Sequence, residues 1–250
     1  MNGGSRLPAF FHLLRLAEVD STNEEAKRQA KAGAGEGLVV WADRQSAGRG
    51  RQGRAWRSPP GNLYVSILLR PGRGAAEAAQ LSFAAAVAVA DVLAPLLPEN
   101  AAPRLKWPND VLIAGRKVAG ILLESQATGG VLDALVVGIG INLVSYPEDA
   151  GTRAISLAAA GAGAATADAV LAALLDCFLA RYETWRTQGF APLRAAWLDR
   201  AHGLGGEIRV RQARLDTVGR FVDLDPAGAL VLENESGRQN ISAGSVFPVG

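Results

Sequence analysis

Two apolar runs with β-strand character, Leu38–Trp41 and Leu63–Leu69, flank a segment of very different composition. Residues 43–57, here called the arginine–glycine loop, contain five arginines and three glycines. The whole connection spans about twenty residues, and connections of that length are usually functional or disordered. Glycine lets the backbone approach a ligand closely, and arginine binds phosphate or carboxylate through two parallel hydrogen bonds. The segment therefore predicts a site for an anionic small molecule.

Composition limits the classes of protein to which the chain can belong. Its 250 residues, 49% of them hydrophobic, suffice for one large domain or for a large and a small one. The single cysteine, Cys177, excludes an intramolecular disulfide, and a cytoplasmic location is expected. A formal net charge of +2 argues against a general nucleic-acid-binding surface. The most apolar stretch, residues 81–97, contains Asp91 and Pro95 and is expected to be a buried helix rather than a membrane span.

The spacing of apolar and turn-forming residues predicts an α+β region. The Ser21–Glu25 segment has the spacing of a helix-capping box, so a helix is expected from there to about Lys31. Further helices are expected at about residues 75–94 and 166–188, and strands at residues 38–42, 63–69, 111–113, 117–124 and 131–143. Residues 1–17 are too few to form a folded module of their own.

The end of the chain changes character and predicts a small all-β unit. Short β-like runs alternate there with turn signals, at residues 207–212, 217–224, 229–234 and 238–242. We therefore expect two domains, residues 1–190 with the ligand site and residues 191–250 with the small β unit.

Several local motifs have more than one interpretation. The spacing of Gly48, Gly50 and Gly53 matches a dinucleotide fingerprint, but the Ser58–Gly61 segment contains two prolines and prevents the helix that the fingerprint needs. A solvated surface hairpin is the alternative for this loop. Glycines at 138 and 140 inside an apolar strand indicate either a bulge or the close approach of a ligand. No cluster of histidine and cysteine predicts a metal centre.

Four motifs occur in a fixed order along the chain, at residues 21–23, 45–56, 106–124 and 138–142. Their sequences are Ser-Thr-Asn, Gln-Ser-Ala-Gly-Arg-Gly-Arg-Gln-Gly-Arg-Ala-Trp, a segment that opens with Lys-Trp-Pro-Asn-Asp, and Gly-Ile-Gly-Ile-Asn. The ordered set resembles biotin–protein ligase from about residue 16 to the end. The resemblance implies a mixed, largely antiparallel sheet with flanking helices, like that of class II aminoacyl-tRNA synthetases, and a C-terminal SH3-like β-barrel.

The resemblance also implies the reaction and its participants. The biotin carboxylate attacks the α-phosphate of ATP, with Mg²⁺, to give biotinyl-5′-AMP. A lysine of a biotin carboxyl carrier domain, in acetyl-CoA carboxylase or a related carboxylase, then accepts the biotinyl group. A carboxylate needs no general base, so the protein has to position two anions and stabilise charge. The short segment before residue 17 cannot hold a DNA-reading helix-turn-helix domain, so no DNA binding and no membrane are expected, and a homodimer is left open.

Residue roles follow by motif. The resemblance assigns biotin to Ser21, Thr22, Asn23, Gln45, Arg49, Gly50, Arg51, Lys117, Gly120, Gly138 and Gly140. It assigns the nucleotide to Arg51, Trp56, Asn109 and Asn142, the catalytic roles to Arg51 and Lys117, and Mg²⁺ to Asp110. Two alternatives stay open, a lipoate–protein ligase of the same fold and a non-catalytic RNA-binding module that uses the arginine–glycine loop.

Overall fold

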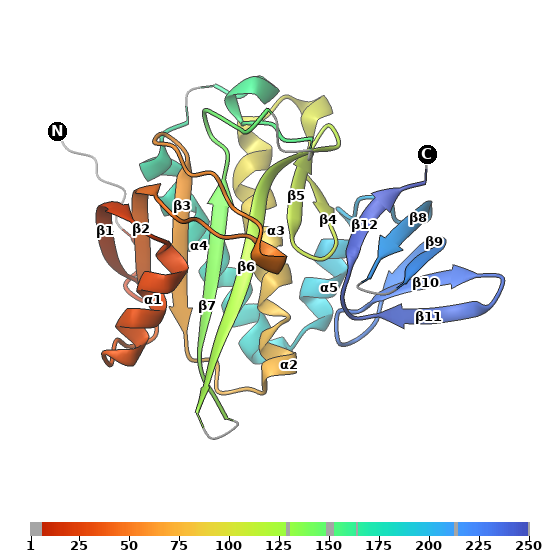
Figure 1. Ribbon diagram of the computed structural model, residues 1–250, viewed down its shortest axis with the longest axis horizontal. Coiled ribbons are helices and arrows are strands. Elements are labelled where there is room, and N and C mark those ends of the chain that lie inside the picture. The colour runs from red at the N-terminus through yellow and green to blue at the C-terminus, as the bar shows by residue number, and fades with distance from the viewer. Residues whose placement is uncertain (1–6, 129–130, 149–152, 164, 213–214, 250) are drawn as a thin grey trace.

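The computed structural model describes residues 7–128, 131–148, 153–163, 165–212 and 215–249. Within them, a seven-stranded mixed sheet forms the centre of the molecule (Figure 1). Its strands are, in spatial order, β1 (His12–Val19), β2 (Leu38–Gln45), β3 (Leu63–Leu69), β7 (Val131–Ile141), β6 (Arg116–Thr128), β5 (Asp110–Ile113) and β4 (Arg104–Lys106). β1 and β2 are parallel, and the other neighbouring pairs are antiparallel.

One face of the sheet carries the short helix α1 (Thr22–Lys31). This helix links the parallel strands β1 and β2, because a parallel pair needs a crossover connection. The apolar residues of α1 and of the strands beneath it form a small core, made of Ala26, Ala30, Val40, Leu68, Ala134 and Val136. The N-terminus of α1 is thereby fixed over the middle strands of the sheet.

Three helices cover the opposite face, namely α3 (Leu81–Leu93), α4 (Ala167–Gln188) and α5 (Ala191–Leu198). The segment Ala75–Leu96 is long and apolar enough to cross a membrane, but 61% of its most apolar window is buried inside the protein. The prediction of a buried helix is therefore confirmed. The expected single helix at residues 75–94 is in fact divided into α2 (Ala75–Ala78), α3 and a 3-10 turn (Ala94–Leu96).

The C-terminal strands form a separate antiparallel sheet, consistent with the expected SH3-like unit. Their spatial order is β11 (Gly237–Ile241), β10 (Leu230–Asn234), β9 (Asp216–Leu224), β8 (Glu207–Arg211) and β12 (Ser245–Pro248). The unit packs beside β4 and α5 (Figure 1). The Phe221 ring lies 6.4 Å from the Trp197 ring, and Trp107 Nε1 donates to the Gly228 carbonyl at 3.1 Å. At the edge of the main sheet, Lys106 Nζ on β4 lies 5.5 Å from the ring centroid of Phe247 on β12.

Four of the described helices and strands were not expected from the sequence, namely β1, β4, α5 and β12. The segment before residue 17 was judged too short for a module, yet most of β1 lies there and pairs with β2 along the edge of the sheet. Its residues are exposed or half-buried, and its sequence alternates less clearly between apolar and polar residues than the buried, largely apolar β3. An edge strand of this kind gives a weak signal because only a partner strand stabilises it.

Candidate active site

A row of residues crosses the main sheet on the face that carries α1. Cross-strand pairing aligns Tyr64 on β3, Gly140 on β7, Gly120 on β6, Asp110 on β5 and Lys106 on β4. Residues directly opposite each other point to the same face of a sheet. The two glycines therefore leave the middle of the row open, between an aromatic side chain on one side and two charged side chains on the other.

The next row, closer to α1, consists of Ser66, Gly138 and Leu122. Asn23 at the N-terminus of α1 fills the space above Gly138, where an added Cβ would lie 2.2 Å from Asn23 Oδ1. A cavity of about 270 Å³ lies over both rows, between the N-terminus of α1, the arginine–glycine loop and strand β12. Such a concave site, with polar groups that converge on it, is the usual form of a small-molecule pocket.

Every residue to which the sequence assigned a role lines this one cavity. They are Ser21, Thr22, Asn23, Gln45, Arg49, Gly50, Arg51, Trp56, Asn109, Asp110, Lys117, Gly120, Gly138, Gly140 and Asn142. The structure thus brings together residues that lie between positions 21 and 142 of the sequence. The role of each residue stays a prediction. The solvated-hairpin alternative for the arginine–glycine loop is wrong, since the loop forms a wall of the cavity.

The end of the cavity next to α1 is lined by neutral hydrogen-bonding groups. The backbone N–H and the hydroxyl of Thr22 donate to Gln45 Oε1 at 2.8 and 3.1 Å, and Gln45 Nε2 donates to Ser58 Oγ at 2.8 Å. Ser66 Oγ, fully buried on β3, lies 2.7 Å from Thr22 Oγ1. The expected capping box does not form, because the Ser21 side chain makes no capping hydrogen bond and Thr22 belongs to this network. Ser21 and Thr22 both line the cavity.

Asn23 is held by three partners on two strands, β3 and β6. Its Oδ1 accepts from Ser66 Oγ at 2.6 Å, and its Nδ2 donates to Glu124 Oε2 at 2.8 Å and to the Leu122 carbonyl at 3.3 Å. Burial alone would raise the pKa of Glu124. The hydrogen bonds from Lys27 and Asn23 together lower this pKa by a larger amount, so the net shift is downward. The carboxylate is therefore ionised at neutral pH and fixes the orientation of the Asn23 amide.

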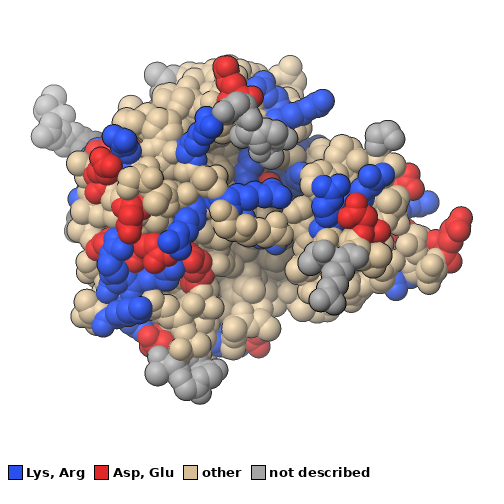
Figure 2. Space-filling view, in the orientation of Figure 1, with Lys and Arg blue, Asp and Glu red and all other residues tan. Residues whose placement is uncertain are grey.

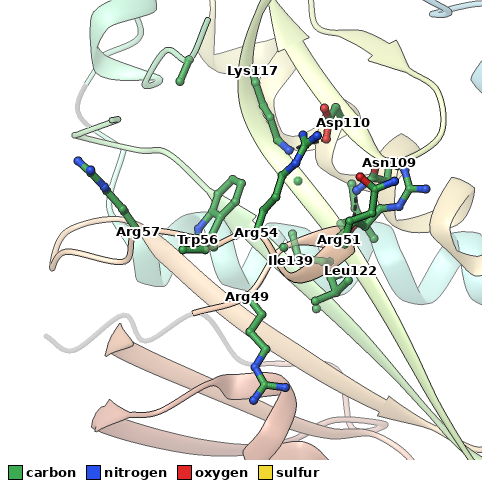
Figure 3. A pocket seen from close by; sticks show the side chains of 18 of the residues that line it. Arg49, Arg51, Arg54, Trp56, Arg57, Asn109, Asp110, Lys117, Leu122 and Ile139 are labelled. Atoms are coloured by element: carbon green, nitrogen blue, oxygen red, sulfur yellow. Dashed lines mark hydrogen bonds and ion pairs between the residues drawn. The ribbon is translucent and has the colours of Figure 1, made fainter. Parts of the chain in front are cut away.

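Arg49 ties the arginine–glycine loop to α1. Its Nη1 lies 2.6 Å from Glu24 Oε1, and Lys27 Nζ bridges Glu24 and Glu124 at 2.7 and 2.9 Å. Figure 2 shows this mixture of acidic and basic side chains over α1. In Figure 3 the Arg49 side chain points away from Arg51. The Arg49 guanidinium thus serves as an anchor of the loop in this structure.

The opposite end of the cavity is strongly basic. Its only carboxylate among the described lining residues, Asp110, pairs with Lys117 Nζ at 2.6 Å. Arg51 Nη1 donates to Asn109 Oδ1 at 3.1 Å and lies 3.5 Å from the Gly244 carbonyl of the C-terminal unit. Burial lowers the pKa of Arg51, although its charge is retained at neutral pH. Arg54 points to the same place, and positive charge therefore exceeds negative charge here (Figure 3).

Trp56 lies between the two ends of the cavity, in the space that the missing side chains of Gly120 and Gly140 leave over the sheet. A Cβ added at Gly140 would lie 2.6 Å from Trp56 Cε2, and one at Gly120 would lie 3.1 Å from Trp56 Cζ3. Lys117 Nζ lies 5.2 Å from the ring centroid, within the range of a cation–π contact. Among the described residues, the buried Trp56 Nε1 has no hydrogen-bond partner. An orphaned buried donor of this kind points to a ligand that supplies an acceptor.

Some residues of the cavity had no expected role. Tyr64 lines the cavity, and the buried Ser66 contacts Thr22 and Asn23 beside it. The two residues interrupt the apolar run of β3 at alternate positions, and that period of two is a signal for polar groups on one face. Phe247 enters from β12, which sequence patterns did not reveal. Asn142 lines the cavity, but its Nδ2 donates to the Ile155 carbonyl at 3.2 Å.

Comparison with known proteins agrees with this geometry. The model of the biotin/lipoate A/B protein ligase family matches residues 16–142, and that of the biotin protein ligase C-terminal domain matches residues 203–247. The chain belongs to the biotin/lipoate A/B protein ligase family.

Individual relatives cover nearly the whole chain. The chain is 44% identical to a biotin–[acetyl-CoA-carboxylase] ligase of Paracoccus denitrificans, over 93% of this chain and 98% of that protein. It is 35% identical to a ligase of the same name from Mycobacterium tuberculosis, over 92% and 86% of the two chains. The biotin protein ligase of Aquifex aeolicus, solved in complex with biotin and ATP, superposes with a TM-score of 0.80 at 31% identity, over 94% and 97%.

Proposed function

We propose that this protein is an ATP-dependent biotin–protein ligase, which makes biotinyl-5′-AMP and transfers the biotinyl group to a carrier-domain lysine. One observation supports the proposal most directly. A single cavity joins a neutral, hydrogen-bonding end at Thr22, Asn23 and Gln45 to a basic end at Arg51 and Lys117. Biotin has a neutral ureido ring at one end and a carboxylate at the other, and the two ends of the cavity match that order.

The basic end suits the chemistry of adenylation. Two anions, a carboxylate and a triphosphate, have to meet, and the excess positive charge offsets their repulsion. The carboxylate oxygen forms a bond to the α-phosphorus while the bond to the β-phosphate oxygen breaks, and that oxygen keeps the electron pair. Holding both reactants in one site makes the reaction effectively unimolecular. Arg51 and Lys117 are proposed to contact the reacting groups.

The residues fit a Mg²⁺ ion that is held mainly by phosphate oxygens. No group of three potential metal-ligating side chains occurs among the described residues, but Asp110 lines the basic end of the cavity. Mg²⁺ is commonly bound by one or two carboxylates together with substrate phosphates. Asp110 would supply that carboxylate after release from Lys117, and the ion would neutralise phosphate charge. Lys117 would thereby become free to contact the carboxylate of biotin.

The acceptor and the location belong to the same proposal. The acceptor is a lysine in the biotin carboxyl carrier domain of acetyl-CoA carboxylase or a related carboxylase, and the reaction takes place in the cytoplasm. Support comes from the Paracoccus denitrificans relative, whose name specifies acetyl-CoA-carboxylase.

The test separates the two half-reactions. The protein is incubated with ATP, Mg²⁺ and radiolabelled biotin, and biotinyl-5′-AMP and pyrophosphate are measured before and after addition of a carrier domain. We expect stoichiometric adenylate first and labelled carrier afterwards. Lipoate in place of biotin serves as the competing acid. Adenylate formation from lipoate but not biotin would refute the proposal, as would the absence of any acyl adenylate.

A further inference from the structure

The side chain of Asn62 holds the segment of chain that follows β7. Asn62 is only 3% exposed and lies one residue before β3. Its Oδ1 accepts from the backbone N–H groups of Leu143 and Val144 at 2.9 Å and of Ser145 at 3.2 Å. Its Nδ2 donates to the Ser145 carbonyl at 2.9 Å and to Ser145 Oγ at 3.2 Å. All five hydrogen bonds therefore go to residues 143–145.

This amide continues the pairing of β3 with β7 beyond its last backbone pair. Leu63 and Ile141 are the paired residues at that end of the two strands. Past them, the Asn62 side chain supplies both the acceptor and the donor that a neighbouring strand would supply, and an amide carries the two on one planar group. The chain can therefore turn away from the sheet after β7 while its backbone N–H groups stay hydrogen-bonded.

The held segment joins two residues that line the cavity. Asn142 precedes it and Pro147 follows it, and both line the cavity, whereas Asn62 does not. Asn142 is fixed by other partners, because its N–H donates to the Val118 carbonyl at 2.8 Å and its carbonyl accepts from the Leu157 N–H at 2.8 Å. Asn62 thus sets the course of the chain from Asn142 to Pro147, and it affects the cavity through residues 143–145.

The place of this segment along β7 indicates which part of the reactants it meets. Gly138, Gly140 and Asn142 alternate along the chain and so lie on one face of the sheet. Asn23 lies over Gly138, and Trp56 lies over Gly140. Four residues of a strand span about 13 Å, so Asn142 lies about that far beyond the neutral end of the cavity. The ring of a biotin bound at Asn23 does not reach this segment, and the nucleotide is the part of the reactants that does.

We propose that Asn62 is a positioning residue for ATP, which fixes residues 143–145 and thereby holds Pro147 beside Asn142 at the wall of the cavity. The inference rests on the proposed function, since it names a residue that supports the nucleotide site of the adenylation reaction. Asn62 contacts no reactant and transfers no proton. Without its amide the segment after β7 loses its fixed course, and ATP has to order that segment on binding, which costs affinity.

The neutral end of the cavity keeps its own hydrogen bonds without Asn62. Thr22 donates to Gln45 Oε1, and Gln45 Nε2 donates to Ser58 Oγ. These hydrogen bonds involve neither Asn62 nor residues 143–145. The affinity for biotin alone should therefore not depend on Asn62, which separates the proposed role from a general loss of the cavity.

The variant Asn62→Ala tests this role, with Asn234→Ala as its matched control. The Asn234 amide also bonds to backbone, from Nδ2 to the Val218 carbonyl and from the Ser236 N–H to Oδ1, but it lies on β10 and does not line the cavity. For Asn62→Ala we expect the KM for ATP to rise about 5- to 50-fold, as for a net loss of one or two hydrogen bonds. The kcat at saturating ATP should stay within about threefold of the wild type, and the dissociation constant of biotin without ATP should not change. Asn234→Ala should leave all three quantities unchanged. Asn62→Asp keeps the acceptor for the three N–H groups and should show a KM for ATP between those of the wild type and Asn62→Ala.

A purely structural role gives a different result, because it lowers the folded fraction, and hence the apparent kcat, at an unchanged KM for ATP. That result would overturn the proposal, as would wild-type kinetics in Asn62→Ala or a biotin affinity that falls as much as the ATP affinity. Calorimetric binding of α,β-methylene-ATP in the presence of biotin does not depend on turnover, since this analogue cannot be cleaved between its α- and β-phosphorus atoms. A wild type that forms no adenylate would refute the proposed function. Weaker binding of the analogue to Asn62→Ala than to the wild type would still support the role of Asn62, and equal binding to both proteins, or to neither, would overturn it.

Discussion

Replacement of Gly138 by alanine tests the most tightly packed contact of the cavity. The new Cβ would lie 2.2, 2.8 and 2.9 Å from Oδ1, Cγ and Nδ2 of Asn23, so that the amide has to move. Its displacement breaks three hydrogen bonds, one of which goes to the Glu124 carboxylate. Neutral hydrogen bonds contribute about 1 kcal/mol each and those to charged groups about 1.5–3 kcal/mol. Because water replaces part of this loss, we expect the free energy of unfolding to fall by about 3 kcal/mol.

The assay is urea unfolding followed by tryptophan fluorescence, together with calorimetric titration of biotin. Biotin affinity should fall at least about fivefold, because one lost hydrogen bond already changes a binding free energy by about 1 kcal/mol or more. Gly35→Ala is the matched control, since nothing lies within 4 Å of a Cβ at that position. The control should be neutral or stabilise the protein by less than about 1 kcal/mol. A Gly138→Ala variant with the stability of Gly35→Ala and unchanged biotin affinity would refute the reasoning.

Three further predictions follow from the same contacts. Arg51→Ala and Lys117→Ala should fold but lose about 10²–10³-fold in the rate of adenylate formation, as expected for loss of one well-placed donor, whereas turnover near the wild-type rate would contradict their assignment. Ser66→Ala leaves buried acceptors unsatisfied and should lower the free energy of unfolding by about 1–3 kcal/mol, with weaker biotin binding in calorimetry; Ser66→Thr, which keeps the hydroxyl, should retain part of both. Hydrogen bonds from Arg28 lower the pKa of Asp20 from 3.8 to about 2 in the folded protein. The stability that the ionised Asp20 contributes is therefore fully present above pH 3.8, and it is lost as the pH falls through about 2. The difference in urea midpoint between wild type and Asp20→Asn should therefore shrink over that range, and a difference independent of pH would contradict the assignment.

The parts of the fold that could be predicted are those with strong local signals. β3 has the expected bounds, Leu63–Leu69, because it is a largely apolar run with turn residues on both sides. α4 begins after Thr166, whose hydroxyl accepts from the Ala169 N–H, and it ends at Gly189, as the capping pattern indicates. By contrast, β1 depends on pairing with β2, and no local pattern encodes a long-range partner. The composition of the cavity was predictable by motif, but its order along the row was not.

That order is set by strand register, which the sequence does not display. Gly120 and Gly140 are separated by twenty positions in the chain, yet the register of β6 and β7 places them opposite each other. The Trp56 ring packs against both glycines. A glycine inside a strand indicates close approach, but it does not reveal whether a ligand or a side chain of the protein approaches. Here Asn23 approaches Gly138 and Trp56 approaches the other two. Trp56 makes no hydrogen bond through Nε1 within the described residues, so packing and the contact with Lys117 hold the ring. A ligand along this row has to pack against the Trp56 ring, which belongs to the arginine–glycine loop, so we predict that occupancy of the site and the order of that loop are coupled.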